Sequence, residues 1–235
     1  YYIMSNEIFV ILSPNQISID VFDKEKEKSI HNKTYKIENN LSDNIKLEDN
    51  LNGVLKEQII NIEKKINYTV NKINLILCDP NNLKIEISTK KSYDLKQIQK
   101  DQIQYLIQDL KQQILTSNKD LKILHIIIEN YIIDGNKIHE IPLQINCKNL
   151  IIEARFICVK KNLADFFYRI FKNYQIKLNS IICGNYALSL NENDKSNPLE
   201  GGLKVVNGEN MKEVYILPKK PAKLGFFEKM FHLFS

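Results

Sequence analysis

Tryptophan is absent from the sequence, and glycine, proline and arginine are scarce. Only seven glycines and six prolines occur in 235 residues, and 43% of the residues are hydrophobic. This composition excludes a low-complexity chain and indicates one large or two small globular domains. Arg155 and Arg169 are the only arginines in a chain of net charge +5. Because proteins that read nucleic acids usually use arginine forks, the sequence predicts no nucleic-acid partner.

The motifs of common enzyme classes are missing as well. The sequence contains no H-E-x-x-H, no G-x-S-x-G, no G-x-x-x-x-G-K-S/T and no G-x-G-x-x-G. Its four histidines lie far apart and have no metal-ligand spacing: His31, His125, His139 and His232. Without a set of groups that could act together, we expect no catalysis, no cofactor and no bound metal.

The cysteine pattern indicates a reducing compartment. The four cysteines are scattered without a C-x-x-C pair: Cys78, Cys147, Cys158 and Cys183. Three of them lie in apolar runs, so we expect buried, reduced thiols in a cytosolic protein. The sequence shows no signal peptide and no apolar run near the length of a membrane span.

Hydrophobic periodicity predicts strands and helices in irregular alternation. Expected strands cover 7–23 (two strands around Pro14-Asn15), 29–37, 71–78 paired with 83–89, 121–133, 150–159, 176–183, and 203–206 paired with 214–217. Expected helices cover 48–67, 94–115 and 162–173. The alternation has no regular βαβ length and no glycine-rich loop, which predicts an α+β fold: a mixed sheet with flanking helices.

The last twelve residues, 224–235, predict an amphipathic helix. One half of the helical wheel carries Leu224, Phe226, Phe227, Met230, Phe231, Leu233 and Phe234, and the other half carries Gly225, Glu228, Lys229, His232 and Ser235. Such a short helix is marginal by itself in water, so its apolar half needs a cover. The cover could be a membrane interface, the protein's own core or a partner's groove.

Lysines and a stiff linker favour the membrane. The segment Pro218-Lys219-Lys220-Pro221 separates the helix from the domain. We therefore predict that the helix lies in an anionic membrane surface without spanning it. The predicted inserted residues are Leu224, Phe226, Phe227, Met230, Phe231 and Phe234, and the predicted headgroup contacts are Lys219, Lys220, Lys223 and Lys229.

One internal stretch resembles a known family. The run from His125 reads H-I-I-I-E-N-Y-I-I-D-G-N and is followed by a proline loop and by L-I-I-E-A-R-F-I-C. It resembles the FtsA stretch in which a strand ending in Y-x-I/V-D-G precedes a proline loop and a strand carrying L-E-A. The matching positions are Tyr131, Ile133, Asp134, Gly135, Pro142, Leu150, Glu153 and Ala154. FtsA is the actin-like membrane tether of the bacterial division ring.

The resemblance implies a division of the chain into four parts. Residues 1–78 would be a partial actin-like N-terminal segment, 79–190 an SHS2-like subdomain, 191–223 C-terminal strands and a linker, and 224–235 the amphipathic membrane-targeting helix. The family's Asp-Gly-Ser/Thr phosphate loop is replaced by Ser13-Pro14-Asn15-Gln16, and Asp20 stands alone in the second strand. Pro14 has no backbone N–H for a phosphate, so we expect that nucleotide binding is lost.

The expected function is therefore that of an adaptor. The resemblance implies a membrane-tethered protein of the cell-division machinery, at the division site on the cytoplasmic face of the inner membrane. It implies self-association and contacts with other division proteins. Direct FtsZ binding is not carried over, because the subdomain on which FtsZ docks is expected to be missing. The alternative is a PilM-like pilus-assembly adaptor that binds a peptide of a membrane partner in a groove.

Overall fold

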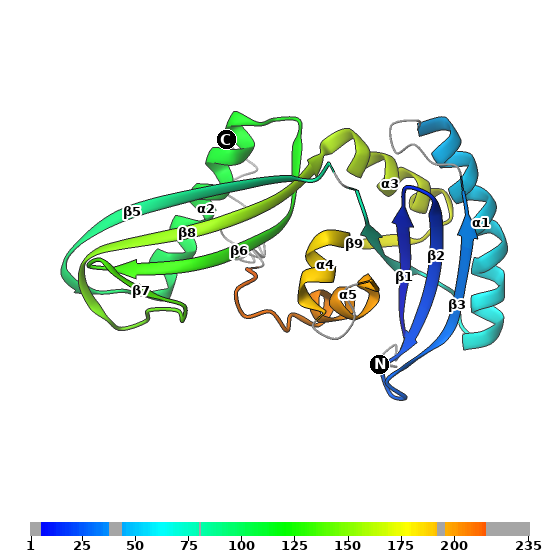
Figure 1. The fold of residues 1–235 in the computed structure, drawn as a ribbon, viewed down its shortest axis with the longest axis horizontal. Helices are drawn as coiled ribbons and strands as arrows, with labels where there is room; N and C mark the ends of the chain where they lie inside the picture. The colour runs from blue at the N-terminus through cyan, green and yellow to red at the C-terminus, as the bar shows by residue number, and fades with distance from the viewer. Residues whose placement is uncertain (1–5, 38–43, 80, 192–195, 215–235) are drawn as a thin grey trace, which may run out of the picture.

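The computed structural model describes residues 6–37, 44–79, 81–191 and 196–214 (Figure 1). Nine strands and five helices follow one another along the described chain. Their order is β1 (Asn6–Ser13), β2 (Gln16–Asp23), β3 (Lys28–Lys36), α1 (Asn44–Ile66), β4 (Lys72–Leu77), β5 (Leu83–Gln97), α2 (Lys100–Ser117), β6 (Leu121–Ile133), β7 (Asn136–Ile138), β8 (Asn146–Lys160), α3 (Lys161–Asn173), β9 (Lys177–Cys183), α4 (Gly184–Leu190) and α5 (Pro198–Asn207).

The first sheet has the strand order β3-β2-β1-β4-β9. The three strands β1 to β3 form antiparallel neighbours, whereas β4 and β9 run parallel to β1. Strand β1 is buried on both faces, which explains its continuous apolar run. Ile8, Val10 and Leu12 enter a core with α1 and α3, and Phe9 and Ile11 enter a second core with α4 and α5. The first sheet is thus covered by helices on both faces.

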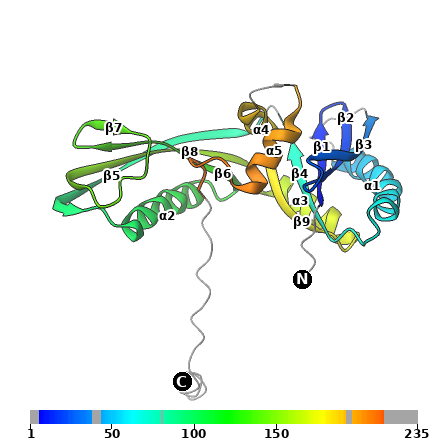
Figure 2. The ribbon, with the colours of Figure 1, turned by 90° about the horizontal axis from the view of Figure 1, so that it is seen from below.

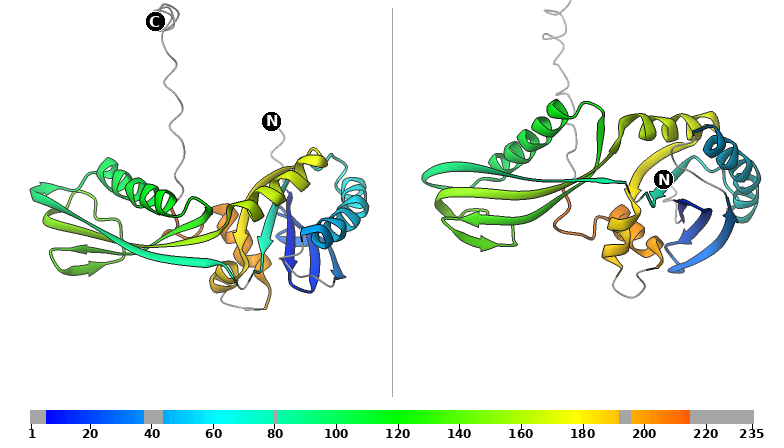
Figure 3. Two further views of the ribbon diagram at one scale, coloured as in Figure 1. Left: turned by 90° about the horizontal axis from the view of Figure 1, so that it is seen from above. Right: turned by 45° about the horizontal axis from the view of Figure 1, so that its top comes forward.

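The second sheet has the order β5-β8-β6-β7 and is antiparallel throughout. Its long strands extend away from the first sheet, and α2 covers one of its faces (Figures 2 and 3). Alternate residues of β8, such as Leu150, Ile152 and Ala154, are buried against α2. The opposite face is largely polar, as is usual for an antiparallel sheet with one solvated side.

The second sheet is an insertion between two neighbouring strands of the first. The chain leaves the first sheet after β4, builds β5 to β8, and returns through α3 to β9, which pairs with β4. In this arrangement α3, β9 and α4 pack with the first sheet. The α+β class, with a mixed sheet and flanking helices, is confirmed.

Two predicted strand pairs are wrong. Strands β4 and β5 do not pair, because the segment between them crosses from one sheet to the other. Residues 203–206 belong to helix α5, which begins with Asn197 as N-cap and Pro198 in the first turn and ends at Gly208 with φ of 70°. Val214 pairs with Ile126 of β6 instead. Helix α4 was not predicted, since its seven residues carry no clear period.

The prediction of buried thiols is confirmed for three of the four cysteines. All four cysteines are free; Cys147, Cys158 and Cys183 are buried, and Cys78 is half-buried. Burial raises the pKa of Cys158 to about 11 and also raises the pKa of Cys78 and of Cys147. These thiols therefore stay protonated at neutral pH and are poor nucleophiles.

Candidate partner-binding groove

A groove of about 470 Å³ lies where the second sheet meets the helices of the first. The end of α2, the beginning of β6 and the beginning of α3 form its walls. Three half-buried aliphatic side chains lie between charged ones. The lining residues are Leu115, Leu121, Ile123, Lys111, Lys119, Lys122, Lys161 and Asp165.

Backbone contacts hold these three elements together. Asn118 ends α2, and both its backbone and its side-chain amide donate to the carbonyl of Ile114, at 2.9 and 3.1 Å. Leu121 pairs with Lys160 across β6 and β8, and the Lys161 N–H donates to the Asp120 carbonyl at 2.6 Å. The α2–β6 turn is therefore fixed against the first residue of α3, so the groove belongs to the fold itself.

The groove is strongly positive. Four lysines face a single carboxylate, that of Asp165. Within the described part of the chain, none of these lysines forms an ion pair, although the Lys122 ammonium lies 4.5 Å from the centre of the Tyr168 ring. Unpaired lysines around an aliphatic floor favour a ligand that carries both carboxylates and aliphatic side chains.

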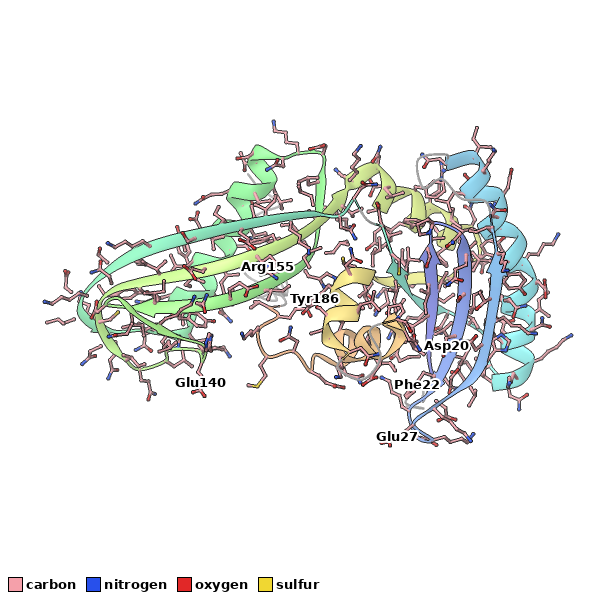
Figure 4. All side chains as sticks on the ribbon, viewed as in Figure 1. Asp20, Phe22, Glu27, Glu140, Arg155 and Tyr186 are labelled. Atoms are coloured by element: carbon pink, nitrogen blue, oxygen red, sulfur yellow. The ribbon has the colours of Figure 1, made fainter. Side chains whose placement is uncertain are left out.

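A second hollow, of about 420 Å³, lies on the polar face of the second sheet. Its central side chain, Arg155, pairs with Glu129 at 3.0 Å and with Glu86 at 3.2 Å (Figure 4). Glu153 accepts from the Asn130 amide at 2.7 Å and pairs with Lys137. The charged groups of this hollow already satisfy one another, which is typical of a solvated sheet face.

The end of β1, where the resemblance would place a phosphate loop, is a tight hairpin. Ser13 pairs with Gln16, so only two residues form the turn, and the Asn15 carbonyl accepts from the Ile37 N–H at 3.0 Å. The Asp20 side chain is buried in β2, where it accepts from Ser29 Oγ and from the Asn32 amide (Figure 4). Within the described residues, no group of three or more His, Cys, Asp or Glu side chains could hold a metal ion.

The D-G stretch of the resemblance forms the turn between β6 and β7. Asp134 and Gly135 have φ values of 48° and 92°. The Asp134 carboxylate accepts from the backbone N–H groups of Lys148 and Asn149, and these bonds hold its pKa below the usual value. The motif thus ties the turn to the start of β8, as expected for a turn residue and not for a catalytic acid.

The predicted membrane-binding residues, from Lys219 to Phe234, lie outside the described residues. No helix in the described ranges has the length and apolar character needed to cross a membrane. Sequence reasoning missed the groove, whose lysines come from three separate segments. The available signal was the density of lysines around the apolar ends of α2 and β6, at Lys119 and Lys122.

No protein-family model and no curated protein matches the sequence. Among solved structures, the chain is similar to PilM in the PilM–PilN type IV pilus biogenesis complex, with a TM-score of 0.50 and 4% identity, over 77% of this chain and 48% of that chain. At this identity the similarity shows the fold alone, and nothing in it is specific to FtsA.

Two further solved structures are more distant in shape. The cytoplasmic domain of EpsL, an inner-membrane component of the type II secretion system of Vibrio cholerae, gives a TM-score of 0.39 with 9% identity, over 81% of this chain and 61% of that chain. A Bacteroides thetaiotaomicron protein with an actin-like ATPase fold gives a TM-score of 0.32 with 13% identity, over 78% of this chain and 54% of that chain. The chain spans about half to three-fifths of the length of these three structures.

Proposed function

We propose that the chain is a non-catalytic adaptor that binds an acidic, aliphatic peptide segment of a membrane protein in the groove between α2, β6 and α3. The observation that carries the proposal is the unpaired lysine set around Leu115, Leu121 and Ile123. The structural similarity to PilM supports the proposal, because PilM has a similar fold and forms a complex with PilN. The predicted C-terminal helix would hold the adaptor on the cytoplasmic face of the inner membrane.

Two machineries could use such an adaptor. The PilM similarity favours a pilus assembly. The residues from Tyr131 to Ala154 that resemble FtsA favour the cell-division machinery, with a location at the division site and self-association. Cross-linking in living cells separates the two, since the adaptor should capture either pilus components or division components.

Reversing the charge of the groove tests the proposal. Lys119 and Lys161 are exposed and have no described ion pair, so Lys119→Glu with Lys161→Glu should leave the fold intact. We expect at least about tenfold weaker binding of a labelled peptide in which glutamate alternates with leucine, measured by fluorescence anisotropy. The matched control is Lys33→Glu with Lys56→Glu, which removes two exposed lysines outside the groove.

Equal peptide binding by both double variants would refute the groove as the binding site. Vesicles of anionic lipid serve as a second probe. If the groove variant loses vesicle binding and keeps peptide binding, the lysines contact headgroups and the adaptor proposal fails. A leucine–lysine peptide of the same length should not bind the wild-type protein, because its charge matches that of the groove.

The proposal also includes the loss of nucleotide chemistry. Titration calorimetry with ATP and magnesium is expected to give no heat of binding. The two-residue turn at Pro14-Asn15 leaves little room for a phosphate cradle, and the Asp20 carboxylate is already bonded to Ser29 and Asn32. A saturable heat that disappears without magnesium would contradict this part of the proposal.

A further inference from the structure

The last described residues, 210–214, return from α5 to the second sheet and form what we name the latch segment. The Ile128 N–H donates to the Lys212 carbonyl and the Val214 N–H donates to the Ile126 carbonyl, both at 2.8 Å. These two bonds add a short antiparallel strand to β6, beyond the part of β6 that pairs with β7. The pairing directs the chain at Val214 toward the beginning of β6, where Leu121 and Ile123 line the groove.

A buried carboxylate fixes this segment. The Glu213 side chain is only 2% exposed, and its two oxygens accept from His125 Nδ1 at 2.7 Å and from the Tyr186 hydroxyl at 2.8 Å. The Asn210 amide donates to the same hydroxyl oxygen at 2.6 Å. Figure 4 shows Tyr186 on α4, between the two sheets. No lysine or arginine in the described ranges forms an ion pair with Glu213.

The groups that donate hydrogen bonds to Glu213 are held in place by other parts of the fold. The backbone N–H of Cys183, at the end of β9, donates to His125 Nε2 at 2.9 Å. That bond leaves Nε2 without a proton, so the proton is on Nδ1 and points at Glu213. The His125 and Tyr186 rings lie 4.6 Å apart. His125, Tyr186 and the Cys183 N–H thus form a socket that joins β6, α4 and β9.

Apart from the bond between Asn210 and Tyr186, few side-chain contacts hold the latch segment. Its Met211 side chain is 93% exposed, and Val214 is only partly buried against the second sheet. Two backbone bonds on a short strand open readily when no side chain anchors them. Because a buried charged hydrogen bond is strong and an unpaired buried donor is costly, the Glu213 carboxylate decides whether the segment is seated or free.

We propose that residues 210–214 are a releasable latch that couples the start of the C-terminal tail to the junction of the two sheets through Glu213. With the latch closed, Val214 stays bonded to Ile126 and the socket keeps His125 aimed at Cys183. When the latch opens, residues 210–214 leave β6 and the Cys183 N–H loses its oriented acceptor. A force applied to the tail would therefore be transmitted to the junction of the two sheets. This inference rests on the contacts of described residues and not on the proposed function.

Amide hydrogen exchange on the full chain tests the latch. Glu213→Gln keeps the shape of the side chain and removes its charge. We expect the amides of Ile128, Val214 and Cys183 to exchange at least about tenfold faster together, while amides of β1 and β4 keep their protection. The matched control is Glu209→Gln, since the Glu209 carboxylate lies just outside the latch segment and accepts from the exposed Asn207 amide. This control variant should leave the exchange rates of the three amides unchanged.

Three outcomes would overturn the inference. Unchanged exchange at Ile128 and Val214 would show that the carboxylate does not hold the segment. Faster exchange there with Cys183 still protected would show a local strand without coupling to the junction. Loss of protection throughout β1 and β4 would show that Glu213 is simply part of the folded core. Tyr186→Phe removes one donor to Glu213 and the acceptor of the Asn210 amide but leaves the carboxylate bonded to His125, so it should give a smaller rise at the same three amides.

Discussion

Gly201→Ala is expected to lower the free energy of unfolding by about 3 kcal/mol and the melting temperature by roughly 10 °C. Gly201 lies in α5 where this helix crosses α4. A Cβ at this position would lie 1.8 Å from the carbonyl oxygen of Ala187 and 2.5 Å from its carbonyl carbon. Both atoms belong to the backbone of α4, so no side-chain rotation relieves the overlap. The two helices would have to separate by about 1 Å, which opens the core they share with Phe9 and Ile76.

The same substitution elsewhere provides the control. Gly53 lies in the interior of α1, and a Cβ there would meet nothing within 4 Å. Gly53→Ala should stabilise the protein by about 0.5–1 kcal/mol, because alanine loses less backbone entropy in a helix. Urea and thermal unfolding followed by far-UV circular dichroism measure both variants. If Gly201→Ala unfolds like the wild type, α4 and α5 do not cross as closely as the structure shows.

Substitution of Gly202, the residue next to Gly201, is expected to have an intermediate effect on stability. Its added Cβ would lie 2.6 Å from Ile76 Cδ1 and 3.3 Å from Phe9 Cε1. Both are side-chain atoms, and the isoleucine methyl can move by a rotamer change. Gly202→Ala should therefore destabilise less than Gly201→Ala.

Local patterns in the sequence were sufficient for most elements. The apolar stripes of α1 and α2, the hairpin at Pro14-Asn15 and the long strand β6 were all predicted near their observed positions. Each of these segments either carries a clear period or ends at turn residues, so local chemistry determines its structure. The prediction of Asp134 as a turn residue was confirmed for the same reason.

The partition into two sheets could not be predicted in this way. Apolar runs such as β4 and β9 indicate buried strands but not their neighbours, because partner choice depends on contacts distant in sequence. The pattern of 203–206 suited a strand as well as a helix, and the capping residues Asn197 and Gly208 decided it. The latch is equally nonlocal, since His125 and Glu213 are 88 residues apart.

The groove shows why the candidate site was harder to predict than the fold. Its lysines come from the end of α2, the start of β6 and the start of α3. In the sequence, each of these lysines looks like an ordinary solvent-exposed charge. The pairing of Leu121 with Lys160 and the backbone bond between Lys161 and Asp120 bring the three segments together. By contrast, the predicted membrane residues form one contiguous segment, so the sequence alone supports that prediction.

Phe227→Glu is expected to abolish binding of the full chain to anionic vesicles without changing the fold. The substitution removes a large apolar side chain from the predicted inserted half of the helix, a loss of about 2 kcal/mol. It also places a negative charge beside an anionic surface, which costs about 1 kcal/mol more. Together these effects predict about a hundredfold weaker partitioning. Sedimentation with vesicles measures it, and a chain ending at Pro221 should stay in solution.

Ser235→Glu is the matched control, because it adds the same charge on the predicted polar half of the same helix. It should reduce binding only slightly, and raised ionic strength should weaken the wild type through Lys219, Lys220, Lys223 and Lys229. If both glutamate variants lose binding equally, charge alone governs attachment, and the prediction of which helix face inserts into the membrane is wrong. If Phe227→Glu instead lowers the melting temperature by several degrees, the segment packs on the protein. The groove would then act without a membrane tether.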